Sequence, residues 1–184
     1  MEKRTLKLKA CLVGENAVGK TSLVKTFVNG EFNDSYVPTI GANVLIKNIE
    51  VYCNDIKYEV SLSIWDLAGQ EQWSKMRSLY LRATQGVFFV GDLTRLDSFR
   101  KINSYWFDEV KKYVSVDVPR ILICNKADLK QEVSNNYVGT LRYKLNFDSV
   151  IKTSAKLKQN VNYAFLFLIS RYVKIEHSFL MNLN

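Results

Sequence analysis

The sequence has little of several residue types, and each shortage excludes a class of protein. Two prolines and eight glycines in 184 residues are too few for a collagen-like or Pro/Gly-rich disordered chain. The three cysteines, Cys11, Cys53 and Cys124, form no CxxC pair and cannot build a complete disulfide framework. The single histidine, His177, argues against Cys/His metal binding and against Ser–His or Cys–His catalysis. We expect His177 to be a surface residue.

Long apolar runs are also absent. No run reaches the roughly 18 residues of a membrane span, and the opening residues MEKRTLKLKA contain no apolar stretch of the signal-peptide type. Hydrophobic residues still make up 47% of the chain, enough for the core of one domain of this length. We therefore expect a soluble, intracellular single domain over residues 1–184, with its core at about 5–174 and a C-terminal tail at 175–184.

The charge is unbalanced but dispersed. The 26 Lys and Arg residues against 18 Asp and Glu residues give a net charge of +8, which favours nucleic acid or an anionic membrane as a partner. However, the basic residues are scattered along the chain, and neither an RNP-like aromatic block nor zinc-finger spacing is found. The sequence predicts a solvated basic surface and no nucleic-acid partner.

Strand patterns alternate with helical patterns along the chain. Apolar alternation and short apolar runs predict strands at 5–13, 44–51, 58–65, 86–90, 120–124 and 150–153, the second and third joined as a hairpin by a turn at 53–55. Helical periodicity covers 22–29, 97–114 and 161–174. This order predicts an α/β fold with a mainly parallel central sheet, one antiparallel edge strand, and helices on both faces. Ligands bind beyond the carboxyl ends of such strands.

A phosphate-binding pattern follows the first predicted strand. Residues 14–21 fit GxxxxGK[ST] and lead directly into the first predicted helix. Backbone N–H groups of such a loop can hold phosphate oxygens, and the helix N-terminus adds a favourable dipole. Lys20 is expected to reach the β- and γ-phosphates, and the Thr21 hydroxyl to bind Mg²⁺. The alternative interpretation is a turn rich in small residues. The loop consists of Gly14, Glu15, Asn16, Ala17, Val18, Gly19, Lys20 and Thr21.

The strand at 58–65 leads into a second candidate segment. Asp66 lies where a carboxylate can bind Mg²⁺ through water, and Gly69 lets the backbone approach a terminal phosphate. Gln70 can orient an attacking water molecule. DxxGQ alone is a weak pattern that also occurs in turns, but it is far more informative after a phosphate loop.

Two later segments predict which base is bound. Asn125, Lys126 and Asp128 form an NKxD pattern directly after the strand at 120–124. An aspartate carboxylate can accept hydrogens from both N1 and the 2-amino group of guanine, whereas adenine lacks this donor pair. The segment Ser154, Ala155, Lys156 follows the next strand, where the Ala155 N–H can donate to the guanine O6. Taken alone, NKxD is equally typical of a capping or turn segment.

Together these residues resemble the Ras superfamily of small GTPases, over about residues 5–174 and with all five nucleotide motifs in order. The resemblance implies a P-loop NTPase fold (G domain) and the cofactor Mg²⁺. It implies that Thr39, in the switch I segment 36–41, binds Mg²⁺ and senses the γ-phosphate. It also implies switch II at 67–82, an aromatic contact of Phe32 with guanine, and a place for Ser22 and Tyr36 at the nucleotide.

The Rab branch fits best. Segments 38–41, 65–71 and 79–83 are similar to Rab segments, and Trp65 and Tyr80 match two members of an effector-binding aromatic triad. Val44 occupies the third place, where phenylalanine is usual. Rab proteins end in prenylated cysteines, but no cysteine follows Cys124, so either the chain is truncated or the protein is not prenylated. The resemblance implies a cytoplasmic protein, peripheral membrane attachment being left open.

These features predict a GTP/GDP switch that hydrolyses GTP slowly, with a Rab-like role in membrane trafficking. Gln70, Lys20 and Thr39 are the expected catalytic residues. No arginine occurs between Arg4 and Arg77, so switch I supplies no arginine finger, and a partner's arginine can accelerate turnover by about 10³–10⁵. Ras-type phosphate loops carry glycine at the position of Asn16, which is beside the place that a partner's arginine would occupy. The expected partners of this monomer are GTP, GDP, an effector, an exchange factor and a GTPase-activating protein.

Two alternatives remain. A GTP-bound scaffold with negligible hydrolysis shares every binding motif but makes no use of Gln70. A P-loop kinase or ATPase conflicts with Asp128, and no lid segment or second substrate site is visible in the sequence.

Overall fold

A six-stranded sheet forms the centre of the molecule in the computed structural model, which describes residues 2–33 and 37–181. The strand order is β2-β3-β1-β4-β5-β6, and only the β2–β3 pair is antiparallel. The predicted mainly parallel sheet with one antiparallel edge strand is confirmed. The strands are β1 (Glu2–Val13), β2 (Ala42–Cys53), β3 (Ile56–Leu67), β4 (Gly86–Asp92), β5 (Arg120–Asn125) and β6 (Ser149–Lys152).

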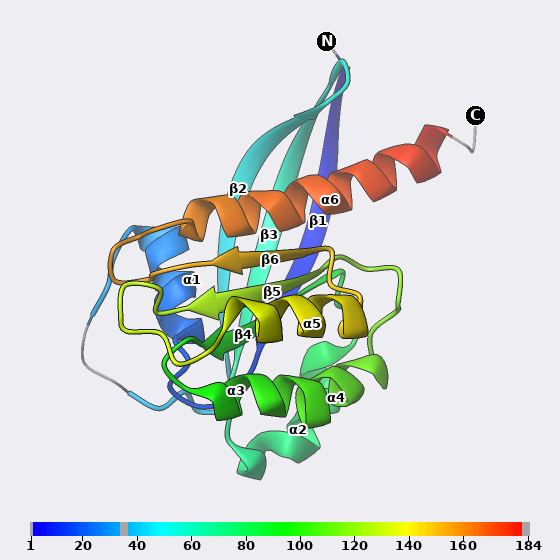
Figure 1. Cartoon of the computed structure of the whole chain (residues 1–184). Helices are drawn as coiled ribbons and strands as arrows, with labels where there is room; N and C mark the ends of the chain where they lie inside the picture. Colours follow the sequence, from blue (N-terminus) through cyan, green and yellow to red (C-terminus); the bar gives the residue numbers. More distant parts are fainter. Residues whose placement is uncertain (1, 34–36, 182–184) are drawn as a thin grey trace.

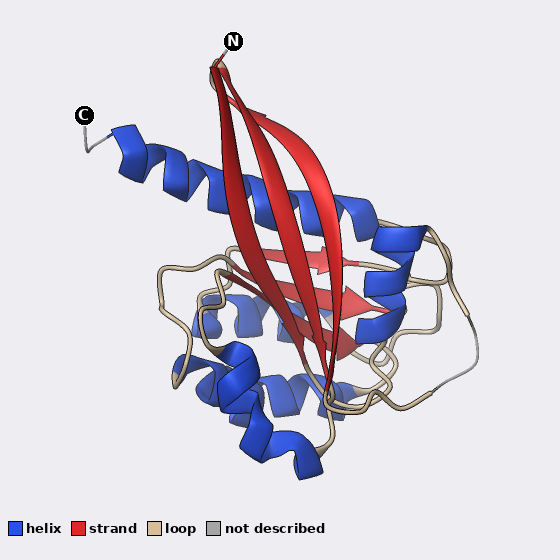
Figure 2. Ribbon diagram, turned by 180° about the vertical axis from the view of Figure 1, so that it is seen from behind, coloured by secondary structure: helices blue, strands red, loops and turns tan. Residues whose placement is uncertain are grey.

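Helices cover both faces of this sheet (Figures 1 and 2). On one face, α1 (Lys20–Asn29) and α6 (Val161–Met181) bury an apolar cluster that includes Phe27, Phe88 and Phe165. On the other face, a second cluster includes Phe89 and Trp106. The elements there are α2 (Ser74–Leu81), α3 (Leu96–Lys101), η2 (Ile102–Trp106), α4 (Phe107–Lys111) and α5 (Asn135–Leu145). A short 3₁₀ turn, η1 (Glu71–Trp73), precedes α2.

One predicted helix contains an irregular turn, and two helices were missing from the prediction. The helix predicted at 97–114 consists of α3, the π-helical turn η2 and α4 in direct succession. Helix α5 begins at Asn135, and the side chain of the preceding Ser134 accepts a hydrogen bond from the Tyr137 N–H. This is the N-cap arrangement that satisfies an otherwise unpaired helix donor. Neither α5 nor α2 was predicted.

The C-terminal region differs from the prediction. Helix α6 continues to Met181, where the sequence predicted a helix ending at 174 and a tail after it. His177 is only 9% exposed, which corrects its expected surface position. One ring nitrogen lies 2.9 Å from the Tyr58 hydroxyl and the other 3.1 Å from the Asn54 amide nitrogen. The extra helical turns therefore pack against the hairpin end of the long strands β2 and β3, which extend well beyond β4, β5 and β6 (Figure 2).

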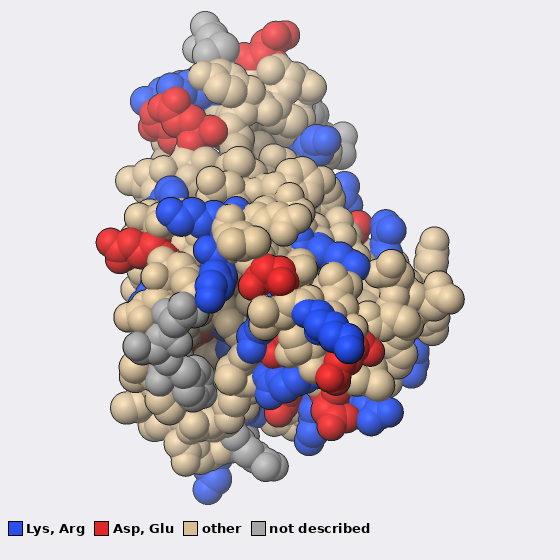
Figure 3. Space-filling view, turned by 60° about the vertical axis from the view of Figure 1, so that its left-hand side comes forward, with Lys and Arg blue, Asp and Glu red and all other residues tan. Residues whose placement is uncertain are grey.

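The fold gathers the motif-bearing loops at one edge of the sheet. Because β1, β3, β4, β5 and β6 are mutually parallel, their carboxyl ends lie together. Four motif segments lie at the ends of β1, β3, β5 and β6, whereas the segment with Thr39 leads into β2. On the face shown in Figure 3, Lys and Arg side chains are interspersed with Asp and Glu side chains. Within residues 2–33 and 37–181, no helix has the length and apolar character needed to cross a membrane.

Candidate functional site

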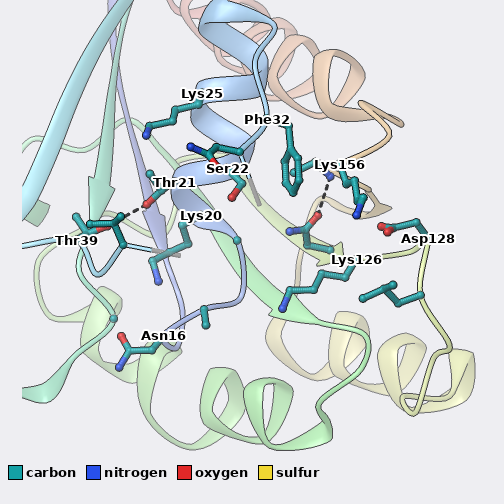
Figure 4. A pocket seen from close by; sticks show the side chains of 18 residues that line it. Asn16, Lys20, Thr21, Ser22, Lys25, Phe32, Thr39, Lys126, Asp128 and Lys156 are labelled. Atoms are coloured by element: carbon teal, nitrogen blue, oxygen red, sulfur yellow. Dashed lines mark hydrogen bonds between the residues drawn. The ribbon is translucent and has the colours of Figure 1, made fainter. Parts of the chain in front are cut away.

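The gathered loops surround a pocket of about 390 Å³ (Figure 4). Lys20, Thr21 and Thr39 lie toward one end, and Phe32, Asp128 and Lys156 lie toward the other. The walls therefore come from segments far apart in the sequence. The lining residues are Asn16, Ala17, Gly19, Lys20, Thr21, Ser22, Lys25, Phe32, Asn33, Val37, Thr39, Gly69, Asn125, Lys126, Asp128, Leu129, Ala155 and Lys156.

Close backbone packing shapes the loop between β1 and α1. A Cβ added at Gly14 would lie 2.3 Å from the Val90 carbonyl oxygen, and one at Gly19 would lie 2.2 Å from the Asn125 amide nitrogen. Gly19 also has φ +98°, a conformation that favours glycine. Both glycines of the GxxxxGK pattern are thus required by space, and Gly19 also by its backbone conformation.

Lys20 is the first residue of α1, and its side chain is buried inside the loop. Its Nζ donates to the backbone oxygens of Gly14 at 2.7 Å and Glu15 at 2.8 Å. Burial lowers the pKa of Lys20 to about 8, although the nearby Asp66 carboxylate favours the charged form. The ammonium group is therefore held by carbonyl oxygens at the end of the pocket where Thr21 and Thr39 lie.

Three oxygen-bearing side chains meet beside Lys20. The Thr21 and Thr39 hydroxyl oxygens lie 2.9 Å apart, and the Thr21 hydroxyl donates to Asp66 Oδ2 at 2.5 Å. Asp66 is fully buried, and its Oδ1 has no hydrogen-bond partner among the described residues. Burial raises the pKa of the Asp66 carboxyl, while the hydrogen bond from Thr21 and the charge of Lys20 oppose this effect. The cluster joins α1, the segment before β2, and the end of β3.

The segment after β3 contacts the phosphate loop closely, but Gln70 is turned elsewhere. A Cβ added at Gly69 would lie 2.7 Å from the backbone nitrogen of Asn16, so no larger residue fits without displacing the loop. Gln70 is not among the lining residues. Its Oε1 accepts a hydrogen bond from Gln72 Nε2 at 2.7 Å. The carbonyl oxygen that could orient a water molecule is therefore engaged by a neighbouring amide.

Arg77 is a second feature of this segment, and no sequence pattern singled it out. It is 2% exposed, and its guanidinium lies 4.4 Å from the centre of the Trp106 ring. It donates to the Tyr105 hydroxyl and, at 2.9 Å, to the backbone oxygen of Gln70. Trp106 in turn donates to the Glu15 side chain at 3.0 Å. Helix α2 is thus joined to the η2 turn and, through it, to the phosphate loop.

Asn125 joins three loops at the other end of the pocket. Its Nδ2 donates to the Val18 oxygen at 2.9 Å, while its Oδ1 accepts from the Thr153 hydroxyl at 3.1 Å and the Ala155 N–H at 3.3 Å. The following residue, Lys126, has φ +63°, a left-handed conformation that is uncommon outside glycine. This turn leads to Asp128, which lines the pocket.

Most of the predicted site residues line this one pocket, and some do not. Four predicted residues belong to the lining loops without lining the pocket themselves: Gly14, Glu15, Val18 and Ser154. Asp66 does not line the pocket either, but it accepts a hydrogen bond from the lining residue Thr21. Tyr36 falls outside the described residues. Four lining residues were not predicted. Lys25, Asn33 and Leu129 lie beside the motifs, and Val37 lies in the segment 36–41, where only Tyr36 and Thr39 were given a role.

The donor set beside Lys20 consists of oxygen atoms, two from hydroxyls and two from one carboxylate. Oxygen ligands of this kind suit Mg²⁺. No group of three or more His, Cys, Asp or Glu side chains able to hold a metal occurs in the described part of the chain. A magnesium site here would therefore have to combine threonine hydroxyls with Asp66 and further oxygen atoms.

A strand, a glycine-containing phosphate loop and a helix at the edge of a parallel sheet define a P-loop nucleotide-binding protein. Comparison with known proteins identifies the family. The Ras family profile matches residues 9–174, and the chain belongs to this family.

Its relatives include proteins of the Rab and Ypt type. The GTP-binding protein YPTM2 of Zea mays is 36% identical over 162 residues, which span 86% of this chain and 76% of that protein. The Ras-related protein Rab-1C of Dictyostelium discoideum is 34% identical over 165 residues, 89% and 79% of the two chains. The GTP-binding protein ypt1 of Schizosaccharomyces pombe is 35% identical over 168 residues, 90% and 79% of the two chains. This chain is a Rab-like regulatory small GTPase.

Proposed function

We propose that the pocket binds GTP and GDP with Mg²⁺ and that the two nucleotides set alternative arrangements of the segments around Thr39 and Gly69. The observation that carries the proposal is the meeting of Thr21, Thr39 and Asp66 at one end of a pocket whose other end holds Asp128. Phosphate recognition and base recognition thus have separate sets of residues.

The base end selects guanine in this proposal. The Asp128 carboxylate accepts hydrogens from N1 and the 2-amino group, while Phe32 packs against the base. Asn125 already accepts the Ala155 N–H at 3.3 Å, so this N–H must be shared when it donates to the guanine O6. Lys126 and Lys156 line the same end of the pocket.

The oxygen cluster holds the metal in this proposal. Thr21 and Thr39 bind Mg²⁺ directly through their hydroxyls, and Asp66 binds through water, which gives its unpartnered Oδ1 a hydrogen-bond partner. When bound, Mg²⁺ neutralises charge on the β- and γ-phosphates. Because these side chains bond to one another in the structure, they must separate slightly to receive the ion and its water molecules.

Hydrolysis needs a rearrangement of Gln70. Its Oε1 leaves Gln72 and accepts a hydrogen bond from the attacking water, which orients the water toward the γ-phosphate. Lys20 and the loop N–H groups stabilise the charge that develops on the phosphate oxygens. No arginine from switch I assists this step, so intrinsic turnover is slow and an activating partner supplies the missing positive charge.

The signal is carried by contacts with the γ-phosphate. Thr39 and the Gly69 backbone hold this phosphate in the GTP state, and hydrolysis releases both segments. An effector binds the closed arrangement, and an exchange factor reopens it. We further propose a cytoplasmic monomer that does not bind nucleic acid, acts in membrane trafficking and can attach peripherally to a membrane.

The GTP-bound scaffold is not favoured, because Gln70 and Thr39 are both retained and the family consists of GTP hydrolases. The test is phosphate release from GTP with Mg²⁺ and with an excess of either ATP or GTP as competitor. Unlabelled GTP should suppress release from labelled GTP and ATP should not. Suppression by ATP would contradict the role of Asp128. Binding of GTP without any release of phosphate would favour the GTP-bound scaffold.

A further inference from the structure

Asp92, the last residue of β4, is a buried carboxylate that collects four donors. It is 0% exposed, and Thr94 donates its backbone N–H at 3.0 Å and its hydroxyl at 2.8 Å to Oδ1. Lys126 Nζ lies 2.7 Å from Oδ2, and Arg95 Nε donates to the same oxygen at 3.1 Å. Burial raises the pKa of Asp92, but the bonds from Lys126 and Thr94 outweigh it and hold the pKa below its ordinary value. The nucleotide contacts proposed above do not use this carboxylate.

The two cations on Asp92 connect to different parts of the pocket. Lys126 comes from the segment at the base end. Arg95 also donates Nη2 to the backbone oxygen of Asn16 at 2.6 Å, in the phosphate loop. The guanidinium therefore bridges a carboxylate and a carbonyl with two of its nitrogens, which suits the fork geometry of arginine.

The backbone that presents Arg95 is fixed. The Arg95 backbone N–H donates to the Asp92 backbone oxygen at 2.9 Å, which closes a turn. Ser98 is 2% exposed, accepts the Asp92 N–H at 2.9 Å and donates its hydroxyl to the Arg95 oxygen at 2.7 Å. Arg95 thus starts from a well-anchored turn at the beginning of α3.

We propose that Arg95 and Asp92 form a clasp that couples the phosphate loop to the base-binding segment and slows nucleotide release. The proposal rests on the nucleotide site proposed above. Arg95 acts as a positioning residue: it holds Asn16, while Lys126 is held by the same carboxylate. Without the clasp, the contacts of the phosphate loop and those of the base-binding segment with the nucleotide form and break independently.

The first test measures release of a fluorescent GDP into excess unlabelled GDP. Loss of one charge-assisted hydrogen bond at the loop corresponds to about tenfold faster release from Arg95→Ala. Arg95→Lys should resemble Arg95→Ala, because one ammonium group cannot reproduce the fork. Arg100→Ala is the matched control, since among the described residues Arg100 pairs only with the exposed Asp97 on the same helix, at 2.9 Å. Its release rate should stay within about twofold of the wild type.

The second test measures the coupling itself. Inosine diphosphate lacks the 2-amino group, so it loses one contact with Asp128 and keeps its contacts with the phosphate loop. We compare the release rate of inosine diphosphate with that of GDP. Their ratio should be at least about twofold smaller in Arg95→Ala than in the wild type, because free-energy changes at coupled sites are not additive. An equal ratio would overturn the clasp, even if both nucleotides leave faster. Unchanged GDP release with slower single-turnover hydrolysis would instead make Arg95 catalytic and would overturn it too. A wild type that holds no GDP would overturn the proposed function together with the clasp.

Discussion

The two ends of the pocket are held in different ways. At the proposed base end, buried hydrogen bonds made by the Asn125 side chain hold the loops to one another. At the phosphate end, Lys20 bonds to its own loop, Thr21 bonds to Asp66, and Gln70 bonds to Gln72. The groups proposed to recognise the base are therefore already supported, whereas the groups proposed to meet the phosphates and the metal must exchange partners.

This difference separates recognition from switching. A preformed base site loses little conformational freedom on binding, which favours tight and selective binding. A phosphate end whose polar groups satisfy one another can adopt a second arrangement only when the γ-phosphate and metal offer better partners. Changes at the proposed phosphate end, and one far from the pocket, test this difference.

The largest effect is expected from Lys20→Ala. This change removes the ammonium group at the phosphate end and with it several charge-assisted hydrogen bonds, so the affinity for GDP should fall at least about a hundredfold. Calorimetric titration measures the loss. Lys144→Ala, an equal charge change on the exposed surface of α5, is the control. Similar affinities for the two variants would show that Lys20 makes no phosphate contact.

Gln70→Leu should affect the chemical step alone. Without the amide that orients water, single-turnover hydrolysis should slow by about a hundredfold, while GTP affinity stays within about twofold. Gln72→Ala is the companion variant, since it only frees the Gln70 oxygen, and it should hydrolyse GTP at least as fast as the wild type. A large loss of GTP binding by Gln70→Leu would mean that Gln70 has a structural role.

A smaller effect is expected from pH. Burial lowers the pKa of Lys20 to about 8, and contact with phosphate oxygens must raise it, because negative charge favours the ammonium form. Nucleotide binding should therefore take up a proton above pH 8, and affinity should fall there by at most about tenfold per pH unit. Calorimetry in two buffers of different ionisation enthalpy counts the protons, with a titration of free GDP as correction. Constant affinity from pH 7 to pH 9 would contradict this account of Lys20.

The smallest effect on the site is expected far from it. His177→Ala removes the partner of Tyr58 and Asn54, which should lower the free energy of unfolding by about 1–2 kcal/mol and the melting temperature by a few degrees. GTP hydrolysis should be unchanged. Ser178→Ala, which loses only an exposed bond within α6, is the thermal control. Equal melting temperatures for the two variants would show that the contact with the hairpin adds nothing.

The sequence predicts most of the fold and much of the site because both depend on local patterns. Strand alternation and the position of each motif directly after a strand place Lys20, Gly69 and Asp128 at one edge of the sheet. Local patterns do not show contacts between distant segments, such as His177 with Tyr58, which lie 119 residues apart. They also show neither the burial of Arg77 nor the contact of Arg95 with the Asn16 backbone oxygen, so no role was predicted for either arginine.

The extent of the helices was harder to predict for a physical reason. Helix α6 gains its last turns from packing against the hairpin, a tertiary contact that local propensity does not contain. The η2 turn interrupts a helix whose apolar periodicity is otherwise regular, and it places Tyr105 and Trp106 where they meet Arg77. Such adjustments follow from packing and not from the pattern itself.

One end of the pocket is proposed to select guanine, and the other to hydrolyse the nucleotide bound there. Both roles can be tested together by purifying the protein without added nucleotide, denaturing it, and identifying the released nucleotide by chromatography. The released nucleotide should be mostly GDP. Mostly GTP would contradict the hydrolytic role of the phosphate end, and an adenine nucleotide would contradict the selection of guanine by Asp128.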